Sequence, residues 1–552
     1  MFYEYQLTNF KAFEGPETIP IRPITLIYGP NSSGKSSIIQ SLLLFKQTLE
    51  QAESGTVLLP RGNLVDLANY QELIHKHEVD RQFAAKIVLK VDPNTLPEST
   101  RGLLGKAVNH ETITVGIKLV FAYCDQKIEV RSAEYFLDDT DQTFAVFDFD
   151  EQPDFSGFVL KSLGKNHDFW ENWWQSIKSR ITPQWNYELQ KSFSSLTSDH
   201  PKRVGKDREE QLNALLLHFE NMRAEDSSET LDDNISTIEA LIQLNQELSK
   251  NPNFDTAIEH LIASIRYTKF LDLQNFLPGS TLALSTEPLI QRLEILSGVY
   301  QDSFSGLTDL TDYLGSEFAK FFKNISYIGP LREYPERFYI ATDSSNGQVG
   351  KSGKMTTEML LKDPDLLAQI NQRFKDFKIS YKLKSVELKP TDSEINASGM
   401  YTIRLLDKHG VNVSLLDVGF GISQVLPIIT QSLVSQGETI IIEQPELHLH
   451  PKLQTELGDL FIESALVRSN TLIVETHSEH LLLRIMKRMR QTYEETLPND
   501  KSKVTPDDVA VLYVDDNDDC TVVRHMELNR HGEFVKSWPE GFFDEELDEL
   551  FF

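Results

Sequence analysis

Cysteine is nearly absent from this chain of 552 residues, which contains only Cys124 and Cys520. The two lie far apart in the sequence, and neither belongs to a CxxC pair or has a nearby cysteine or histidine partner. This spacing argues against a disulfide framework and against a zinc finger. We expect both cysteines to be buried and to behave as small apolar residues.

Long apolar runs are also lacking, because no stretch approaches the about 18 residues that a membrane-spanning helix needs. The N-terminal sequence MFYEYQLTNF has neither the basic segment nor the continuous apolar segment of a secretory signal. A content of 40% hydrophobic residues is enough for one or two large buried cores. The sequence therefore predicts a soluble, globular, cytoplasmic protein with no membrane contact.

Positive charge is scarce: Lys and Arg total 54, Asp and Glu total 83, and the net charge is −29. A chain this acidic repels phosphate backbones on average, so contact with nucleic acid would need a local basic patch or a partner. Two runs are candidates for such a patch: RIMKRMR, with Arg484, Lys487, Arg488 and Arg490, and PKRVGKDR, with Lys202, Arg203, Lys206 and Arg208. Solvated helix faces are the simpler interpretation of both runs.

The order of patterns along the chain predicts an α/β domain that is interrupted once. Residues 1–150 contain a strand, a loop and a helix, followed by strand-like segments that we expect to form an antiparallel β lobe. Residues 151–322 are polar with helical periodicity, as in DREEQLNALLLHFENMR, and predict a helical insertion. Residues 323–552 alternate strands with helices and end in two strands that are joined by the turn-rich sequence DDNDD.

The sequence GPNSSGKS matches the pattern G-x-x-x-x-G-K-[ST] and stands between a predicted strand and a predicted helix, as a phosphate-binding loop must. Glycines let the backbone turn its N–H groups toward phosphate oxygens, where the helix dipole adds positive potential. The lysine would neutralise the β- and γ-phosphates of ATP, and the serine after it would bind Mg²⁺. The candidate ATP-binding residues are Gly29, Pro30, Asn31, Ser32, Ser33, Gly34, Lys35, Ser36 and Ser37.

Two further strands end in chemically active residues. TIIIE ends in Glu443, where an acid would hold Mg²⁺ together with Ser36, and TLIVETH ends in His477, where a γ-phosphate sensor would lie. A solvated carboxylate and a structural histidine are the alternatives. A metal site that joins Glu446 to the four nearby histidines is a further alternative, although the phosphate interpretation already accounts for this region.

With these segments in order, the chain resembles the ABC-class ATPases of the RecF/SMC/OLD group within the AAA family. The motifs that carry the resemblance are GPNSSGKS, IIEQPELHLHP and WPEGFF, and the likeness covers about residues 1–150 and 323–552. It implies an ABC-type P-loop ATPase head in which LLDVGFGISQVLP replaces the ABC signature. Gly419, Gly421, Ser423 and Gln424 would then contact the γ-phosphate of the other subunit in a head-to-tail homodimer, or higher oligomer, that encloses ATP. The segment GPLREYPERFY, with Arg332 and Arg337, is also typical of this branch, without a derived role for either arginine.

Gln444 departs from the hydrolysing ABC proteins, which have a glutamate directly after the Mg²⁺ acid. A glutamine can orient water but cannot accept its proton, so the sequence predicts slow hydrolysis. Glu446, two residues later, is the candidate base, and a glutamate turned to solvent is the alternative.

The resemblance is strongest to the ATPase subunit of Septu-type antiphage systems, including those attached to retrons. It implies an HNH-type nuclease as partner, in retron systems together with a reverse transcriptase and its retron DNA and RNA. Nuclease activity of the chain itself is not expected, because Asp516 and Asp518 fit a turn between two strands better than a two-metal site. The alternatives are a DNA-repair or recombination ATPase that binds DNA directly, and a structural dimer without an effector.

Overall fold

The computed structural model describes residues 1–53, 55–101, 104, 110–152, 155–163, 170, 172, 217, 269–270, 273–274, 277–278, 282–283, 294–340, 347–388, 400–517 and 520–539. The chain divides into two compact units. The first comprises Met1–Leu89, Ala122–Ile128 and Phe318–Phe552, and the second comprises Lys90–Phe121 and Glu129–Glu317.

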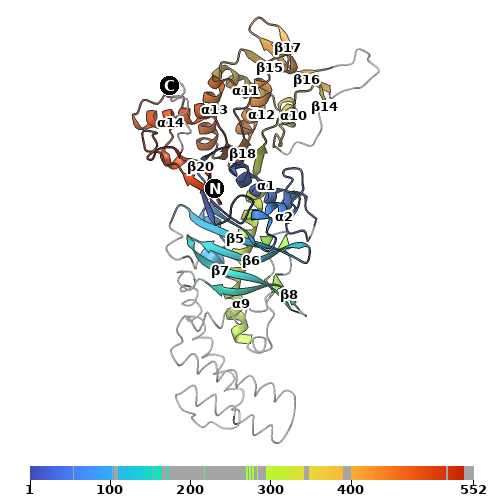
Figure 1. Ribbon diagram of the computed structural model, residues 1–552, viewed down its shortest axis with the longest axis vertical. Helices are drawn as coiled ribbons and strands as arrows, with labels where there is room; N and C mark the ends of the chain where they lie inside the picture. The colour runs from blue at the N-terminus through green and yellow to red at the C-terminus, as the bar shows by residue number, and fades with distance from the viewer. Residues whose placement is uncertain are drawn as a thin grey trace, which may run out of the picture. The chain divides into compact units, whose positions relative to one another are not determined.

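The first unit is built on a six-stranded sheet whose members come from both ends of the sequence. Its strands, in spatial order, are β13 (Ile325–Ile328), β18 (Thr439–Glu443), β19 (Thr471–Glu475), β3 (Ile24–Tyr28), β20 (Val509–Asn517) and β21 (Cys520–His525). All neighbours pair in parallel except β20 and β21, which form an antiparallel hairpin. Figure 1 shows the blue N-terminal elements among the orange and red C-terminal ones.

The central strands are continuous buried apolar runs, as parallel strands covered on both faces must be. All five residues of β3 and all five of β19 are buried. The surrounding helices are α1 (Lys35–Gln51), α10 (Thr356–Lys362), α11 (Pro364–Asp376), α12 (Gly421–Val434), α13 (Pro451–Leu466) and α14 (Glu479–Tyr493). One hydrophobic core joins most of these helices to the sheet. The carboxyl ends of β3, β18 and β19 therefore meet at one edge, where parallel α/β sheets bind ligands.

Two smaller antiparallel groups complete the first unit. Strands β2 (Glu17–Pro20), β1 (Phe2–Thr8) and β4 (Phe83–Val91) pair in that order, and near them in sequence lie α2 (Tyr70–Leu73) and the 3-10 turn His75–His77. The second group has the order β14 (Tyr339–Ile340), β16 (Met400–Asp407) and β15 (Tyr381–Glu387), with β17 (Asn412–Ser414) also paired to β16. Short 3-10 turns at Leu415–Asp417 and Pro506–Asp508 lead into α12 and β20.

The second unit contains an antiparallel meander. Its strands are β5 (Ile113–Cys124), β6 (Lys127–Leu137), β7 (Asp139–Gln152) and β8 (Phe155–Leu163), which neighbour one another in sequence order. Shorter elements are Pro93–Thr95, α3 (Glu98–Arg101), β9 (Lys269–Phe270), β10 (Leu273–Gln274), β11 (Leu277–Pro278) and β12 (Leu282–Ala283). The long helix α9 (Glu294–Lys323) begins in this unit and ends in the first.

The predicted α/β fold with an antiparallel lobe is confirmed. The expected change to helix near residue 150 is displaced, because β7 runs through it and β8 follows. Most of the predicted helical insertion, 151–322, including Lys202, Arg203, Lys206 and Arg208, lies outside the described residues, and so does Asp518. Both cysteines are partly exposed rather than buried as expected. No helix in the described part of the chain is long and apolar enough to span a membrane.

Candidate nucleotide and magnesium site

The loop GPNSSGKS joins β3 to α1 at the carboxyl edge of the six-stranded sheet. Gly29 has a φ of 144°, and a Cβ there would lie 2.2 Å from the carbonyl oxygen of Val514, so no larger residue fits. Gly34, with a φ of 101°, lets the chain turn directly into α1. The first turn of α1 has no acidic residue and no side-chain cap. Its backbone N–H groups are therefore available to an anion.

Lys35 is buried at the start of α1, with an exposed fraction of 4%. Its ammonium group donates hydrogen bonds to the carbonyl oxygens of Gly29 and Pro30, at 2.9 and 2.6 Å. Burial lowers the pKa of Lys35, and the nearby charge of Glu475 opposes that shift. The loop thus holds a buried cation by its own backbone, in the position where a phosphate group would meet it.

The other residues of the loop differ in burial. Pro30, Asn31 and Ser32 are exposed, whereas Ser33 and Ser37 are buried. The hydroxyl of Ser33 has no hydrogen-bond partner among the described residues. An unsatisfied buried hydroxyl is costly, and a bound phosphate oxygen would supply the missing partner. The residues of this loop therefore fit a nucleotide phosphate.

Ser36, the expected Mg²⁺ ligand, contacts a carboxylate that the sequence analysis did not single out. Its hydroxyl lies 2.9 and 3.1 Å from the two carboxylate oxygens of Glu475, the last residue of β19. Burial raises the pKa of Glu475, while the hydrogen bond from Ser36 and the charge of Lys35 lower it. The sequence signal was present, because TLIVE ends in an acid in the same way as TIIIE.

Glu443 lies beside Glu475 on β18, one strand farther from the phosphate loop. Its Oε1 accepts a hydrogen bond of 2.7 Å from the hydroxyl of Tyr327 on β13. Burial is the main cause that raises the pKa of Glu443 to about 7, and the charge of Glu475 raises it further. Two carboxylates therefore stand at the same level of neighbouring strands and repel each other.

Gln444 follows Glu443 in a left-handed conformation, with a φ of 45°. A non-glycine residue in this region is strained by about 1–2 kcal/mol, so its surroundings must hold it there. Its N–H donates to the carbonyl oxygen of Glu475 at 2.7 Å. The guanidinium of Arg332 lies 3.3 and 3.4 Å from its carbonyl oxygen.

No role for Arg332 follows from the sequence, but in the structure its guanidinium contacts the backbone at the end of β18. It is 5% exposed, and its Nη2 donates to the carbonyl oxygen of Glu443 at 2.8 Å. Burial lowers the pKa of Arg332 to about 10, while the charges of Glu446 and Glu443 raise it. The buried guanidinium thus fixes the backbone on which the predicted catalytic residues stand. Arg337 is exposed, and its carbonyl oxygen accepts a hydrogen bond from Thr402.

Glu446 is not turned to solvent, because both of its carboxylate oxygens accept hydrogen bonds. One accepts from the Thr476 hydroxyl at 2.7 Å, and the other from the backbone N–H of His477 at 2.8 Å. Burial lowers the pKa of His477, and the charge of Lys35 lowers it further. The structure therefore brings His477, Glu446 and Lys35 together at the same edge of the sheet.

The expected signature residues lie at the start of α12. Gly421 is tightly packed, since a Cβ there would lie 2.8 Å from the carbonyl oxygen of His448. Apart from its own chain neighbours, no atom of the described residues lies within 4 Å of the corresponding position at Gly419, so this packing does not demand a glycine. Ser423 and Gln424 are buried, and the hydroxyl of Ser423 donates to the carbonyl oxygen of Phe420 at 2.7 Å. Their side chains therefore do not project from the single chain.

The alternative metal site of four histidines finds no support in the described residues, where no group of three or more His, Cys, Asp and Glu side chains could hold an ion. His450 instead accepts a hydrogen bond from the N–H of Lys452 at the start of α13, and the ring of His448 contacts Phe420. Asp516 lies within β20, paired with Thr521 of β21.

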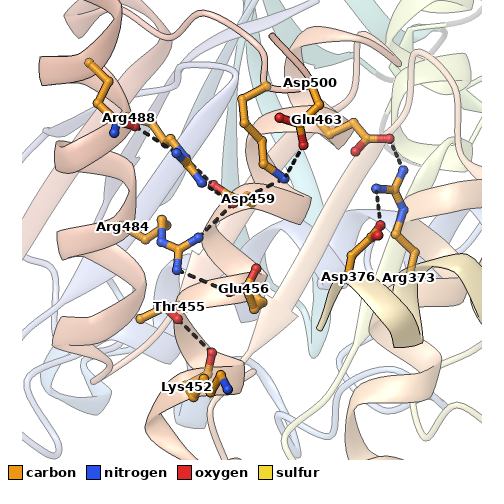
Figure 2. A network of polar contacts seen from close by, with 12 residues as sticks. Arg373, Asp376, Lys452, Thr455, Glu456, Asp459, Glu463, Arg484, Arg488 and Asp500 are labelled. Atoms are coloured by element: carbon orange, nitrogen blue, oxygen red, sulfur yellow. Dashed lines mark hydrogen bonds and ion pairs between the residues drawn. The ribbon is translucent and has the colours of Figure 1, made fainter. Parts of the chain in front are cut away.

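Two of the four basic residues in the run on α14 pair with carboxylates of α13. Arg484 and Arg488 lie 2.8 and 2.7 Å from the carboxylate of Asp459, and Arg484 also contacts Glu456 at 3.3 Å (Figure 2). Lys501 adds a third cation, 3.6 Å from Asp459. The two arginines therefore bind the neighbouring helix, and they do not form an open basic patch.

Comparison of the chain with known proteins shows the family to which it belongs. The AAA ATPase domain family matches residues 3–482. The chain belongs to this family. Membership confirms the expected ATPase, and with it the use of a nucleotide, which in such ATPases is usually bound with Mg²⁺. A second family, described as a protein of unknown function (DUF3696), matches residues 504–551.

Solved structures of SMC head domains are similar to the chain over 96% of its length. One, from Pyrococcus furiosus, has an extended coiled coil and is bound to the C-terminal domain of ScpA, with 12% identity, 97% of that chain covered and a TM-score of 0.35. Another, with a coiled coil and joint from Pyrococcus yayanosii, has 13% identity, 98% coverage and a TM-score of 0.36. A third, from Thermotoga maritima, has 10% identity, 99% coverage and a TM-score of 0.33. No curated protein matches the chain.

Proposed function

We propose that this AAA-family ATPase is a slow nucleotide switch that binds ATP with Mg²⁺, closes as a head-to-tail homodimer and controls a partner nuclease. The observation that carries the proposal is the residue order at the strand end: Glu443 is followed by Gln444, whose amide cannot accept a proton from water. Around it stand the groups that would hold the triphosphate, Lys35 and the N-terminus of α1. The site thus has the parts for binding and lacks the usual part for rapid hydrolysis.

Each residue of the site has a proposed role. Lys35 binds the β- and γ-phosphates, and Ser36 and Glu443 serve the Mg²⁺, which neutralises charge on the phosphate oxygens. Burial and the charge of Lys35 lower the pKa of His477, and its imidazole can donate one hydrogen bond to the γ-phosphate. Gln444 orients the attacking water.

Glu446 stays the candidate base. Its two carboxylate oxygens accept hydrogen bonds from the Thr476 hydroxyl and from the backbone N–H of His477, which hold the carboxylate beside the predicted γ-phosphate sensor.

The proposed dimer rests on the signature segment. Gly419 is a glycine with open space around it, which suits a position that a partner's nucleotide approaches closely. A bulky side chain in this space should leave the single chain folded and keep two copies apart. Gly419→Trp should therefore abolish ATP-dependent dimerisation in sedimentation, whereas Val467→Trp, at an exposed position after α13, should not. A Gly419→Trp protein that dimerises normally would place the interface elsewhere.

The proposed partner is an HNH-type nuclease of an antiphage system of the Septu or retron-associated kind. The sequence resemblance supports this choice, and so do the net charge of −29 and the pairing of Arg484 and Arg488 with Asp459. These same features disfavour the alternative of a repair ATPase that binds DNA directly, since such binding needs free cations on the surface.

Co-purification separates the two functions. The tagged chain, expressed with its neighbouring reading frames, should retain an HNH-type protein or a small structured nucleic acid, identified by mass spectrometry and nucleic-acid extraction. Tight binding of bare DNA by the purified chain alone, without such a partner, would instead support the repair function.

A further inference from the structure

Glu475 is the last residue of β19, which lies between β3 and β18 in the sheet. No sequence motif predicts a role for it. Its Cα partners are Glu443 on β18 and Ile27 on β3, so it stands closer to the phosphate loop than Glu443 does. It is 4% exposed, yet among the described residues it makes no ion pair. A buried carboxylate without an ion pair is unfavourable, and although the charge of Lys35 acts on Glu475, the Lys35 ammonium is bonded to the carbonyl oxygens of Gly29 and Pro30, so a further cation would stabilise this carboxylate.

The hydrogen bond from Ser36 identifies which cation would fit. A serine hydroxyl has one hydrogen and two lone pairs, and the hydrogen of Ser36 is directed to Glu475. Both lone pairs are thereby left for a metal ion, in a fixed orientation. A hydroxyl and two neighbouring carboxylates form a set of hard oxygen donors, which Mg²⁺ and Mn²⁺ prefer.

The hydroxyl of Ser33 indicates that a phosphate group would bind beside this metal ion. The buried hydroxyl of Ser33 lacks a partner among the residues that the structure describes, and it lies in the loop that leads into Lys35 and Ser36. It therefore needs an acceptor, which phosphate oxygens beside a metal would provide.

We propose that Glu475 is a carboxylate of the magnesium site, which together with Glu443 gives the chain affinity for a divalent cation before nucleotide arrives. The inference rests on the proposed nucleotide site and specifies how that site is loaded. Two negative charges beside the loop disfavour metal-free ATP, whereas a bound cation reverses the local charge and attracts the triphosphate. The chain would thus bind ATP steeply as a function of Mg²⁺ concentration.

A matched pair of variants tests this role. Glu475→Gln removes the charge and keeps the shape and an acceptor for Ser36. Glu438→Gln is the control, since Glu438 precedes β18 at the opposite edge of the same sheet and also accepts from two serine hydroxyls, those of Ser326 and Ser435. Each variant removes one carboxylate from the same sheet, the buried Glu475 or the half-buried Glu438.

The first measurement is a Mn²⁺ titration of the nucleotide-free full chain, followed by electron paramagnetic resonance. We expect about 10- to 100-fold weaker Mn²⁺ binding in Glu475→Gln, the loss typical when a supporting group of a metal site is removed, and no change in Glu438→Gln. Unchanged Mn²⁺ affinity in Glu475→Gln, or no Mn²⁺ binding by the wild type, would overturn the inference.

The second measurement is ATP affinity with EDTA and with Mg²⁺. In Glu475→Gln the gain from Mg²⁺ should shrink, while metal-free ATP should bind as well as in the wild type or better, a result that an unfolded variant cannot give. An equal loss with and without Mg²⁺ would show a merely structural role. If the wild type binds no ATP under either condition, the proposed function fails, and the Mn²⁺ titration still reports on Glu475.

Discussion

Two buried clusters of charged side chains lie in the first unit, and they are balanced in opposite ways. The helix-pair cluster (Glu456, Asp459, Arg484, Arg488 and Lys501) pairs its carboxylates with three cations within 4 Å (Figure 2). The strand-end cluster (Lys35, Arg332, Glu443, Glu446 and Glu475) has three carboxylates, two cations and no ion pair among the described residues.

The pKa values of Asp459 and Glu443, one carboxylate from each cluster, differ in the same way. Burial opposes ionisation of Asp459, but the hydrogen bond from Arg488 and the charges of Arg484 and Lys501 outweigh it and lower its pKa. Burial is not offset at Glu443, whose pKa rises to about 7. The compensated cluster joins α13 to α14, whereas we infer that the uncompensated cluster is balanced by a bound ligand. Four changes would sharpen or break this distinction.

The largest effect is expected for Lys35→Ala, which removes the one cation of the phosphate loop. ATP affinity should fall about 10- to 100-fold, because a charge-assisted hydrogen bond contributes about 1.5–3 kcal/mol and the loop backbone cannot replace it. Isothermal titration calorimetry with Mg²⁺ and ATP measures this. Undiminished affinity would remove Gly29–Ser36 from the site.

Breaking the compensated cluster should cost stability. Asp459→Asn leaves the buried Arg488 without its carboxylate and leaves Arg484 with Glu456 alone, a loss of about 3 kcal/mol, measurable by urea unfolding at pH 7. The lowered pKa of Asp459 contributes stability that is present above its unfolded value of about 3.9 and is lost as the pH falls through the folded value. The wild type should therefore lose its advantage over Asp459→Asn in acid. An equal gap at all pH values would contradict the ionic explanation.

Removing a charge from the uncompensated cluster should have the opposite sign. Glu443→Gln relieves repulsion from Glu475 and keeps an acceptor for Tyr327, so the nucleotide-free chain should gain about 1 kcal/mol at pH 8. Because the pKa of Glu443 is raised to about 7, stability is full below the unfolded pKa and declines as the pH rises toward 7. Thermal unfolding from pH 5 to 8 should show this decline in the wild type only, while Mg²⁺-dependent ATP binding weakens in the variant. A destabilised variant would mean that the cluster is balanced after all.

The smallest effect is expected at Gly419. Gly419→Ala should change the free energy of unfolding by less than ~0.5 kcal/mol, because its Cβ would meet nothing. Gly421→Ala should cost about 1–3 kcal/mol, because its Cβ would press on the carbonyl oxygen of His448. Equal losses in denaturant unfolding would show that Gly419 is a packing glycine, which would weaken its place in a dimer interface.

The phosphate loop and the strands around it could be predicted from the sequence, because glycine positions and buried β-branched runs express local backbone requirements. Helix α11 has a clear start signal in Asp363 and Pro364, and the Asp363 side chain accepts two N–H groups. That signal follows a short helix, α10, whose pattern is weak.

The roles of Glu475 and Arg332 could not be read locally. Glu475 lies near the phosphate loop because β19 stands between β3 and β18. The order of strands in the sheet cannot be predicted from the sequence of any single strand. Arg332 acts on backbone more than 100 positions away, at Glu443 and Gln444. The partly exposed cysteines likewise depend on packing that composition does not specify.

The central claim, that this ATPase is a slow switch because Gln444 replaces a base, is tested most directly by steady-state ATP hydrolysis of Gln444→Glu beside the wild type. We expect slow wild-type turnover and a rise of about 10²-fold in Gln444→Glu, since the new carboxylate can accept the proton of the attacking water. Glu446→Gln should lower the residual wild-type rate. Brisk wild-type hydrolysis that Gln444→Glu reduces, with no effect of Glu446→Gln, would contradict the account.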